Sequence, residues 1–137
     1  MKLIIYTDGA ARGNPGPASY GFVILDQGGK VIHKEGKYIG HATNNVAEYK
    51  AVLEALKHVK SHFGDKVQGV EIFADSKLVA EQLSGNYKIK APHLKPIIGK
   101  IKILEFEMGG VIYGHIPRSQ NYLADRLANQ ALDNKLT

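Results

Sequence analysis

The N-terminal part of the chain carries three hydrophobic runs that favour β-strands. Each is rich in β-branched and aromatic residues, and turn-forming residues separate them. We expect strands at Lys2–Thr7, Ser19–Asp26 and Lys30–Ile39. Gly9–Pro17 is rich in Gly, Pro and Asn, which predicts a loop after the first strand. Gln27-Gly28-Gly29 predicts a tight hairpin, so the second and third strands should be antiparallel.

The spacing of hydrophobic residues then changes to that of a helix. Five hydrophobic residues recur at helical intervals: Val46, Tyr49, Leu53, Leu56 and Phe63. Thr43 and Asn44 are candidate N-caps, because their side chains can accept a hydrogen bond from a free backbone N–H. Gly64 is a suitable stop signal at the other end.

The remaining elements alternate between strand and helix. We expect a strand at Val67–Ala74, a helix from Ser76 to about Leu83, a helix between His93 and Glu107, a strand at Val111–Ile116 and a final helix opened by Asn121. The order βββαβααβα predicts an α/β fold with a mixed five-stranded sheet: three antiparallel strands, parallel additions, and helices on both faces. A length of 137 residues suits one domain, spanning 1–137.

Composition narrows the possible chemistry. With no cysteine, disulfides, zinc–thiolate sites and thiol catalysis are excluded, and the chain fits a reducing cytoplasm. The longest apolar runs are short, so we expect no membrane span, and the N-terminus has no signal-peptide pattern. The hydrophobic content of 44% is enough for an ordinary globular core.

The chain is basic, which favours polyanionic partners. Its net charge is +5 and its pI about 9.3. Five lysines fall in one short stretch: Lys88, Lys90, Lys95, Lys100 and Lys102. They are either part of a nucleic-acid-binding surface or the solvated face of a helix.

Four acidic residues stand out by position. Asp8 and Asp75 end the first and fourth strands, while Glu48 and Asp125 fall near the starts of two helices. Because ligands collect beyond the carboxyl ends of parallel strands, all four could converge at one edge of the sheet. The alternative is that each is an ordinary turn former or helix-start acid.

Such a cluster would need cations. Carboxylates within several ångström of one another repel by roughly a kcal/mol or more per pair, even at an effective dielectric of about 20. Two divalent ions would balance four negative charges, and oxygen-only ligands favour Mg²⁺ or Mn²⁺. Two such ions about 4 Å apart are the machinery for in-line phosphodiester cleavage.

The residues around these acids resemble the motifs of type 1 ribonucleases H, in family order and at family spacing. The segments are Tyr6–Pro17 with Tyr20-Gly21, Thr43–Glu48, Asp75-Ser76 and Asn121–Asp125. The resemblance implies the ribonuclease H fold and an endonuclease, acting as a monomer, that cuts the RNA strand of RNA–DNA hybrids to 5′-phosphate and 3′-hydroxyl products. It also implies that Asp8, Glu48, Asp75 and Asp125 bind two Mg²⁺ ions, with Asp8 bridging them and no covalent intermediate.

Recognition of a hybrid requires contacts with the 2′-hydroxyl, which suit short amides and closely approaching backbone. We therefore expect substrate contacts from Gly13, Asn14, Asn44 and Asn45. Thr43, at a helix start, could hold a DNA-strand phosphate as well as cap the helix.

The chain departs from the well-known bacterial pattern in two places. It has no tryptophan-bearing basic helix, and the compact segment Tyr87–Lys90 stands there, with Lys88 and Lys90 as candidate substrate contacts. Before Asp125, a gap-free count puts His115 at the position of the family's product-release histidine. Counting from the strand end favours Arg118, which can hold a phosphate bidentately. The other histidines are interpreted as surface residues: His33, His41, His58, His62 and His93.

Two other functions compete with this interpretation. One is a hybrid- or duplex-binding module whose catalysis has been lost, and the other is a different nuclease on the same fold, such as an exonuclease or a nuclease for double-stranded RNA. The four intact acids argue against the first. The Gly13–Gly16 loop and the Thr43-Asn44-Asn45 run favour the hybrid-specific enzyme over the second.

Overall fold

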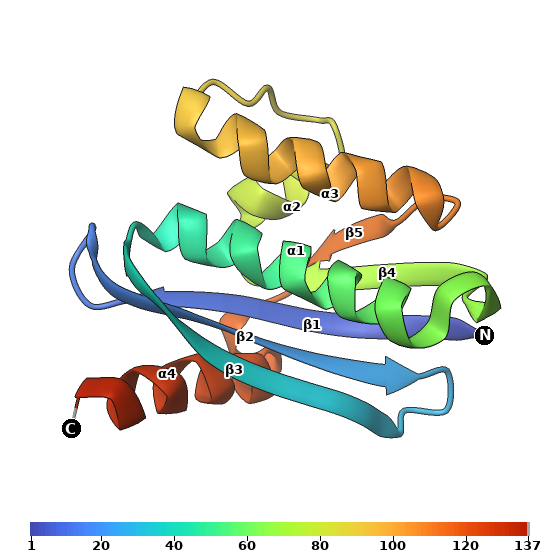
Figure 1. Cartoon of the computed structure of the whole chain (residues 1–137), viewed down its shortest axis with the longest axis horizontal. Coiled ribbons are helices and arrows are strands. Elements are labelled where there is room, and N and C mark those ends of the chain that lie inside the picture. Colours follow the sequence, from blue (N-terminus) through green and yellow to red (C-terminus); the bar gives the residue numbers. More distant parts are fainter. Residues whose placement is uncertain (137) are drawn as a thin grey trace.

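The computed structural model describes residues 1–136 and has the order predicted from the sequence (Figure 1). The strands and helices are β1 (Lys2–Ala11), β2 (Gly16–Asp26), β3 (Val31–Ala42), α1 (Asn44–Phe63), β4 (Gly69–Ala74), α2 (Lys77–Leu83), α3 (Lys95–Glu107), β5 (Ile112–His115) and α4 (Tyr122–Leu136). None of the helices in this part of the chain is long and apolar enough to cross a membrane.

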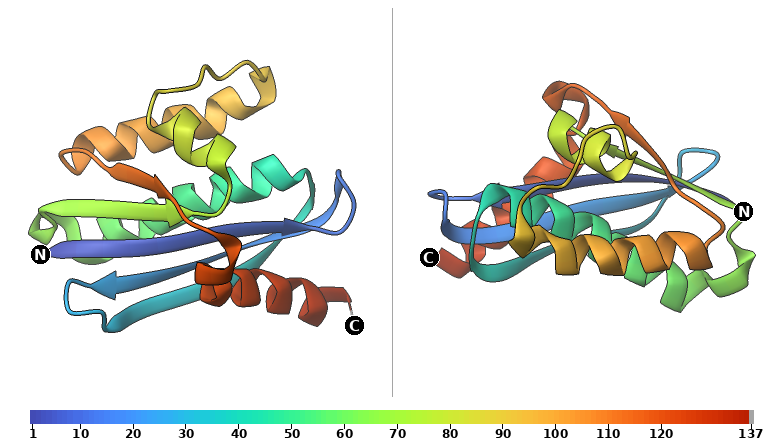
Figure 2. Two further views of the ribbon diagram at one scale, coloured as in Figure 1. Left: turned by 180° about the vertical axis from the view of Figure 1, so that it is seen from behind. Right: turned by 90° about the horizontal axis from the view of Figure 1, so that it is seen from above.

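The five strands form one mixed sheet in the order β3-β2-β1-β4-β5. β1, β2 and β3 are antiparallel neighbours, whereas β4 runs parallel to β1 and β5 parallel to β4. Helices α1 and α3 lie on one face of the sheet and α4 lies on the other (Figures 1 and 2). The mixed sheet with helices on both faces is therefore confirmed.

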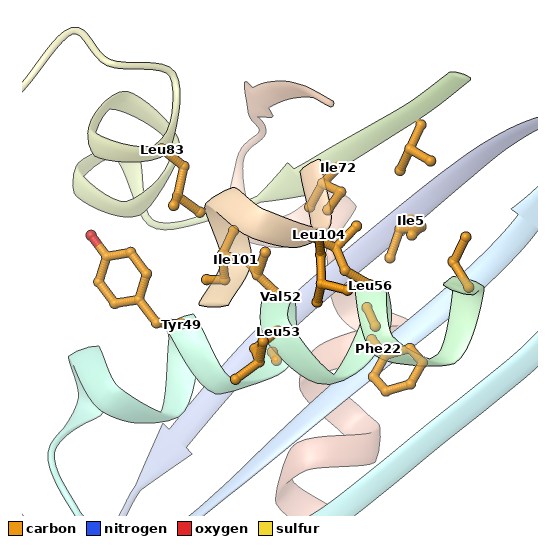
Figure 3. Packing of buried hydrophobic residues seen from close by; sticks show 14 of the residues in the cluster. Ile5, Phe22, Tyr49, Val52, Leu53, Leu56, Ile72, Leu83, Ile101 and Leu104 are labelled. Carbon is orange, nitrogen blue, oxygen red and sulfur yellow. The ribbon is translucent and has the colours of Figure 1, made fainter. Parts of the chain in front are cut away.

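The main core lies between the sheet and α1. Ile5 and Phe22 point from the sheet toward Val52 and Leu56 of α1, and Ile101 of α3 covers the other side of that helix (Figure 3). On the opposite face, three buried residues of α4 pack against the sheet: Ala124, Ala128 and Leu132.

The loop expected at Gly9–Pro17 is wrong in its bounds. β1 continues to Ala11, and its pairing with β2 reaches Ala11↔Ala18. Only Arg12–Pro15 lies outside the strands, and the Arg12 N–H donates to the oxygen of Pro17 across that turn. Gly and Asn usually interrupt strands, but here a glycine is accommodated inside β1 because a helix packs directly above it.

Other boundaries shift by a few residues. β3 extends to Ala42, β4 begins at Gly69, and a 3-10 turn at Pro92–Leu94 precedes α3. The expected caps are present: Thr43 and Ser76 each accept a hydrogen bond from the backbone N–H three residues on, at 3.2 and 3.3 Å. In the expected hairpin, the Asp26 carboxylate accepts from the N–H groups of Gly28 and Lys30.

Candidate active site

Asp8 and Asp75 lie side by side because of the parallel pairing between β1 and β4. That pairing ends at Thr7↔Ala74, and the next residue in each case is an aspartate: Asp8 within β1 and Asp75 directly after β4. Asp8 is not at the end of β1, as the sequence suggested, but within it, and it is only 6% exposed. The end of the parallel pairing, rather than the end of the strand, is what brings the two carboxylates together.

Glu48 comes from α1, and a glycine allows its approach. A Cβ on Gly9 would lie 2.4 Å from the backbone nitrogen of Glu48, closer than any side chain permits. Because Gly9 has none, the start of α1 packs directly on β1. Carboxylate oxygens of Asp8, Glu48 and Asp75 all lie within 4.8 Å of one another.

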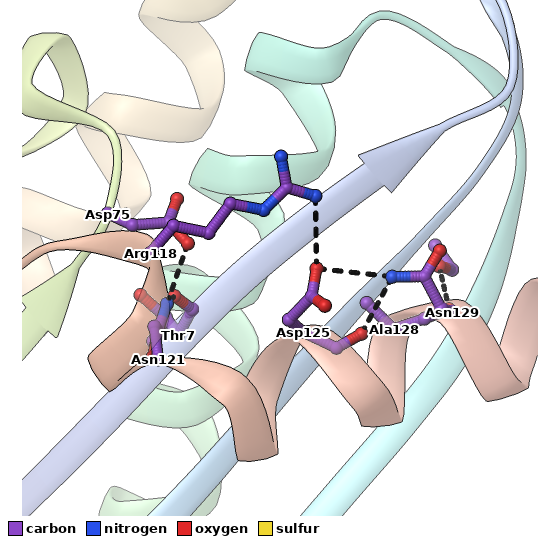
Figure 4. Close-up of polar contacts among 8 residues, drawn as sticks. Thr7, Asp75, Arg118, Asn121, Asp125, Ala128 and Asn129 are labelled. Atoms are coloured by element: carbon purple, nitrogen blue, oxygen red, sulfur yellow. Dashed lines mark hydrogen bonds and ion pairs between the residues drawn. The ribbon is translucent and has the colours of Figure 1, made fainter.

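Asp125 reaches the same place from α4 on the opposite face of the sheet. α4 approaches closely because Gly21 and Gly36 lie beneath it, where a Cβ would come within 2.4 Å of a helix carbonyl oxygen in each case. Asn129, one turn later, donates to both the backbone oxygen and the carboxylate of Asp125 (Figure 4). All four acids therefore line one polar hollow of about 400 Å³, together with Arg118.

Asn121 fastens the start of α4 to the sheet. Its side chain is buried, and its Nδ2 donates to the backbone oxygen of Thr7 at 2.8 Å and to the Asp75 carboxylate at 3.3 Å (Figure 4). The sequence identified Asn121 as the residue that opens the last helix and the family-like motif Asn121–Asp125, but gave it no contact of its own. Its contact with Asp75 joins residues far apart in the chain, and no local pattern indicates it.

Burial and the neighbouring carboxylates raise the pKa values of two acids in the cluster. Burial, then the neighbouring Asp75 charge, raises the pKa of Asp8 to about 9. Burial and Asp75 likewise raise the pKa of Glu48 to about 8, with Arg118 acting in the opposite direction. Without a compensating cation, these two carboxyl groups therefore hold protons at neutral pH.

The donor set fits a hard divalent cation. The four acids offer carboxylate oxygens, and the other polar side chains that line the hollow are amides and guanidinium groups, with no sulfur or imidazole nitrogen among them. Oxygen ligands of this kind select Mg²⁺, Mn²⁺ or Ca²⁺ over zinc. The raised pKa values of Asp8 and Glu48 agree with this, because a bound cation would favour the charged form of both carboxylates.

The candidate substrate contacts lie beside this hollow. The side-chain oxygen of Asn14 accepts from the backbone N–H of Asn44 at 3.0 Å, which ties the β1–β2 turn to the start of α1. Gly13 has φ of +100°, a conformation that favours glycine, and Asn14–Pro15 is a cis peptide bond. Asn45 and Thr43 belong to the same helix start, and Thr43 caps it.

Lys88 and Lys90 lie in the exposed connection between α2 and α3. This connection is at the same end of the molecule as the start of α1 in both views (Figures 1 and 2). Gln82 holds it by donating to the Lys88 backbone oxygen at 3.2 Å, and Tyr49 of α1 in turn donates to Gln82. The backbone of the lysine segment is thus fixed to α1, the helix that carries Glu48, while the Lys88 and Lys90 side chains face solvent.

Arg118 and His115 differ in position. Arg118 lines the hollow, and its guanidinium lies 3.5 Å from the Asp125 carboxylate (Figure 4). His115 is the last residue of β5, pairs in register with Ala74, and is not among the residues that line the hollow. The structure thus brings Arg118, but not His115, to the acids.

The comparisons with known proteins place this site in a family. The reverse transcriptase-like family model matches residues 6–131. A ribonuclease H1 isolated from compost, solved in complex with an RNA/DNA hybrid, superposes with a TM-score of 0.94 at 46% identity, covering 98% of this chain and 99% of that one. Ribonuclease H1 of Halobacterium salinarum gives 0.91 at 39% identity, over 98% and 99% of the two chains.

Curated relatives include larger proteins. A bifunctional protein of Mycobacterium tuberculosis is 41% identical over 136 residues, which is 97% of this chain but 36% of that protein. Ribonuclease HI of Halobacterium salinarum is 40% identical over 134 residues, and the match covers 65% of it. The chain therefore spans about a third of the mycobacterial relative. It belongs to the type 1 ribonuclease H family.

Proposed function

We propose that this protein is a ribonuclease H that hydrolyses the RNA strand of RNA–DNA hybrids internally, leaving 5′-phosphate and 3′-hydroxyl ends. One observation carries the proposal: four carboxylates, from β1, α1, α4 and the residue directly after β4, converge in one polar hollow, next to the asparagine-bearing turn and helix start. The relative solved with an RNA/DNA hybrid, alike over nearly its whole length, supports the substrate class.

We propose Mg²⁺ as the cofactor, with Mn²⁺ as a substitute. Asp8, Glu48, Asp75 and Asp125 would hold two ions, because only about two divalent charges balance four carboxylates in so small a volume. When bound, such a pair supplies an activated water and stabilises the departing oxygen.

The chain's own residues position the substrate. Arg118 reaches over the hollow from a 3-10 turn, with its side chain 79% exposed, so its guanidinium can grip a phosphate bidentately. The Asn14 oxygen is used by Asn44, which leaves the Asn14 amide NH₂ to donate to a sugar hydroxyl. The N–H groups of Asn44 and Val46 already donate to Asn14 and Thr43. The Asn45 N–H at the start of α1, beside the Thr43 hydroxyl, is therefore the group that suits a phosphate of the DNA strand.

We further propose that the enzyme works as a monomer in the cytoplasm. The absence of cysteine is compatible with a reducing compartment. The four acids and the asparagine contacts all come from one chain, so a second copy is not required to complete the hollow.

The test is a cleavage assay on end-labelled RNA–DNA, RNA–RNA and DNA–DNA duplexes, each with Mg²⁺, Mn²⁺ or EDTA. We expect internal cuts in the RNA of the hybrid alone, abolished by EDTA. Asp75→Asn should lower the rate by at least about 1,000-fold while hybrid binding persists. Equal activity in EDTA would contradict the metal-dependent mechanism, and binding without cleavage by the unaltered protein would favour a binding module.

A further inference from the structure

We infer that His33, Glu35, His58 and His62 form a second metal site, for a transition-metal ion such as Zn²⁺, outside the nuclease centre. The four residues come from two elements, β3 and α1. Nitrogen and carboxylate ligands from His₃Glu are a set that zinc accepts and Mg²⁺ does not favour. This assignment replaces the interpretation of these histidines as unrelated surface residues.

The strand supplies two ligands on one face. His33 and Glu35 are two residues apart on β3, so their side chains point to the same side of the sheet. They pair in register with Ile24 and Phe22 of β2, whose side chains belong to the core beneath α1. His33 and Glu35 therefore face α1.

The helix supplies the other two ligands. His58 and His62 are four residues apart on α1 and lie on one helix face. Two histidines at this spacing on a helix are a recurrent zinc-binding arrangement. The site thus combines an i, i+2 pair on a strand with an i, i+4 pair on the helix packed against it.

The side chains are already close together. Ligand atoms of His33, Glu35 and His58 all lie within 4.8 Å of one another. The rings form a stack, with centroids 3.7 Å apart between His33 and His58 and 3.8 Å between His58 and His62. Face-to-face rings do not aim their in-plane lone pairs at one point, so metal binding requires them to tilt. The part-exposed His33 and the exposed His62 leave room for that motion.

The surroundings favour the form of these groups that binds metal. Three stacked imidazolium ions would repel one another, and burial together with His33 and His62 lowers the pKa of His58. Neutral imidazole is the form that coordinates. The Glu35 carboxylate is held in place by Tyr20, whose hydroxyl donates to it at 2.7 Å, and lies 3.4 Å from Nε2 of His33.

The site is separate from the nuclease centre. His33 of β3 pairs with Ile24 of β2, and Ile24 pairs with Ile5 of β1. His33 is therefore two strands away from β1, at the level of a residue three positions before Asp8. None of the four residues lines the polar hollow. A bound ion would link β3, an edge strand, to α1, so its expected effect is on stability rather than on cleavage.

The experiment follows the histidine side chains directly. Full-length ¹⁵N-labelled protein is titrated with Zn²⁺ in excess Mg²⁺, and imidazole nitrogen shifts are recorded. We expect one equivalent of Zn²⁺ to shift His33, His58 and His62, and to leave His41 and His93 unchanged. Because the ion binds the folded form, the Tm should rise with Zn²⁺ concentration.

Matched variants decide the assignment. His33→Ala and His62→Ala should each weaken Zn²⁺ binding by at least about 100-fold and remove the Tm response, whereas His93→Ala should do neither. Glu35→Gln tests the carboxylate without altering a ring. If Zn²⁺ shifts none of the three rings, or binds His33→Ala as tightly as the unaltered protein, the inference is wrong. Binding that Asp8→Asn abolishes and His33→Ala spares would also overturn it, since that ion would lie in the nuclease centre.

Discussion

The amide of Asn121 lies against the carboxylate of Asp75, with Nδ2 donating to Oδ2 at 3.3 Å. The same nitrogen donates to the Thr7 backbone oxygen. One buried side chain at the start of α4 therefore fixes both the strand that carries Asp8 and the acid at the end of β4. Its position makes it a positioning residue for the cluster rather than a cation ligand.

Replacing Asn121 should affect both stability and catalysis. Asn121→Ala removes two hydrogen bonds and leaves the Thr7 oxygen buried without its donor, so we expect a loss of about 1–3 kcal/mol in the free energy of unfolding. Asn121→Asp keeps the shape but adds a negative charge beside Asp75, and should lower the cleavage rate further. Urea unfolding and steady-state cleavage measure the two effects. The exposed Asn86→Ala is the control, and a near-normal rate for Asn121→Asp would remove the positioning role.

The raised pKa values predict how the stability of metal-free protein changes with pH. The pKa of Asp8 rises from 3.8 to about 9 and that of Glu48 from 4.5 to about 8, so the folded form holds protons that the unfolded form has released. This contribution is fully present below the unfolded-state values, and it is lost as the pH rises through 8 to 9. In EDTA, the free energy of unfolding should therefore be higher near pH 6 than near pH 9.

Two comparisons isolate the cluster as the cause. Asp8→Asn removes one of the shifted groups, so its stability should depend less on pH than that of the unaltered protein. Mg²⁺ should restore stability most at high pH, because there the carboxylates are charged and bind the cation without releasing protons. A pH profile that is the same in EDTA and Mg²⁺ would mean that these acids do not bind the ion.

Gly9→Ala should disrupt the packing of α1 on β1. Its Cβ would meet the backbone of Ala47 and Glu48 at 2.4–2.8 Å, so the helix start must move away from Asp8. We expect a destabilisation of about 1–3 kcal/mol and a loss of cleavage. Gly99→Ala is the matched control, because nothing lies within 4 Å of the added Cβ in α3. It should stabilise by up to about 1 kcal/mol at unchanged activity. Equal effects of the two changes would show that the close approach of α1 is not required.

Arg118→Ala should impair cleavage at saturating hybrid much more than His115→Ala. The guanidinium lies over the acids, whereas His115 belongs to the strand end. Arg118→Lys keeps the charge but not the bidentate geometry, so its rate should fall in between. If His115→Ala is the slower enzyme, and if normal activity follows a group titrating near about pH 6.5 that this variant lacks, histidine assists product release instead.

The lysine segment should contribute affinity rather than rate. Replacing Lys88, Lys90 and Lys95 together by Gln should weaken hybrid binding and flatten its salt dependence by up to about one unit per lost phosphate contact. A control triple, Lys30, Lys34 and Lys66, tests whether net charge alone explains the effect. Lys30 belongs to the β2–β3 hairpin and Lys66 to the turn after α1, and both segments lie at the opposite end of the molecule from the lysine segment (Figure 1). Equal losses in both triples would indicate a solvated face.

The sequence predicted the element order because each element carries a local signal. Helical spacing, the caps Thr43 and Ser76, and the stop at Gly64 depend only on neighbouring residues. The end of β1 was misjudged because Gly9 resembles a strand breaker, and the need for glycine there comes from Glu48, a residue remote in the chain.

Local signals likewise predicted one part of the candidate site and missed another. That the four acids converge could be predicted from their motifs and from their expected positions at element ends. The contacts of Asn121, the support of Asp125 by Asn129, and the meeting of His33 with His58 were not predicted. The first and last of these depend on pairings between distant segments, which only the folded sheet defines.

The packing of α4 on the face opposite α1 also determines when the acidic cluster is completed during synthesis on the ribosome. Asp8, Glu48 and Asp75 all precede α2 in the chain, so a growing polypeptide contains these three acids well before α4 has been made. Asp125 and its support Asn129 emerge only with α4. A nascent chain therefore lacks the fourth acid of the cluster until α4 has been synthesised and has docked on the sheet.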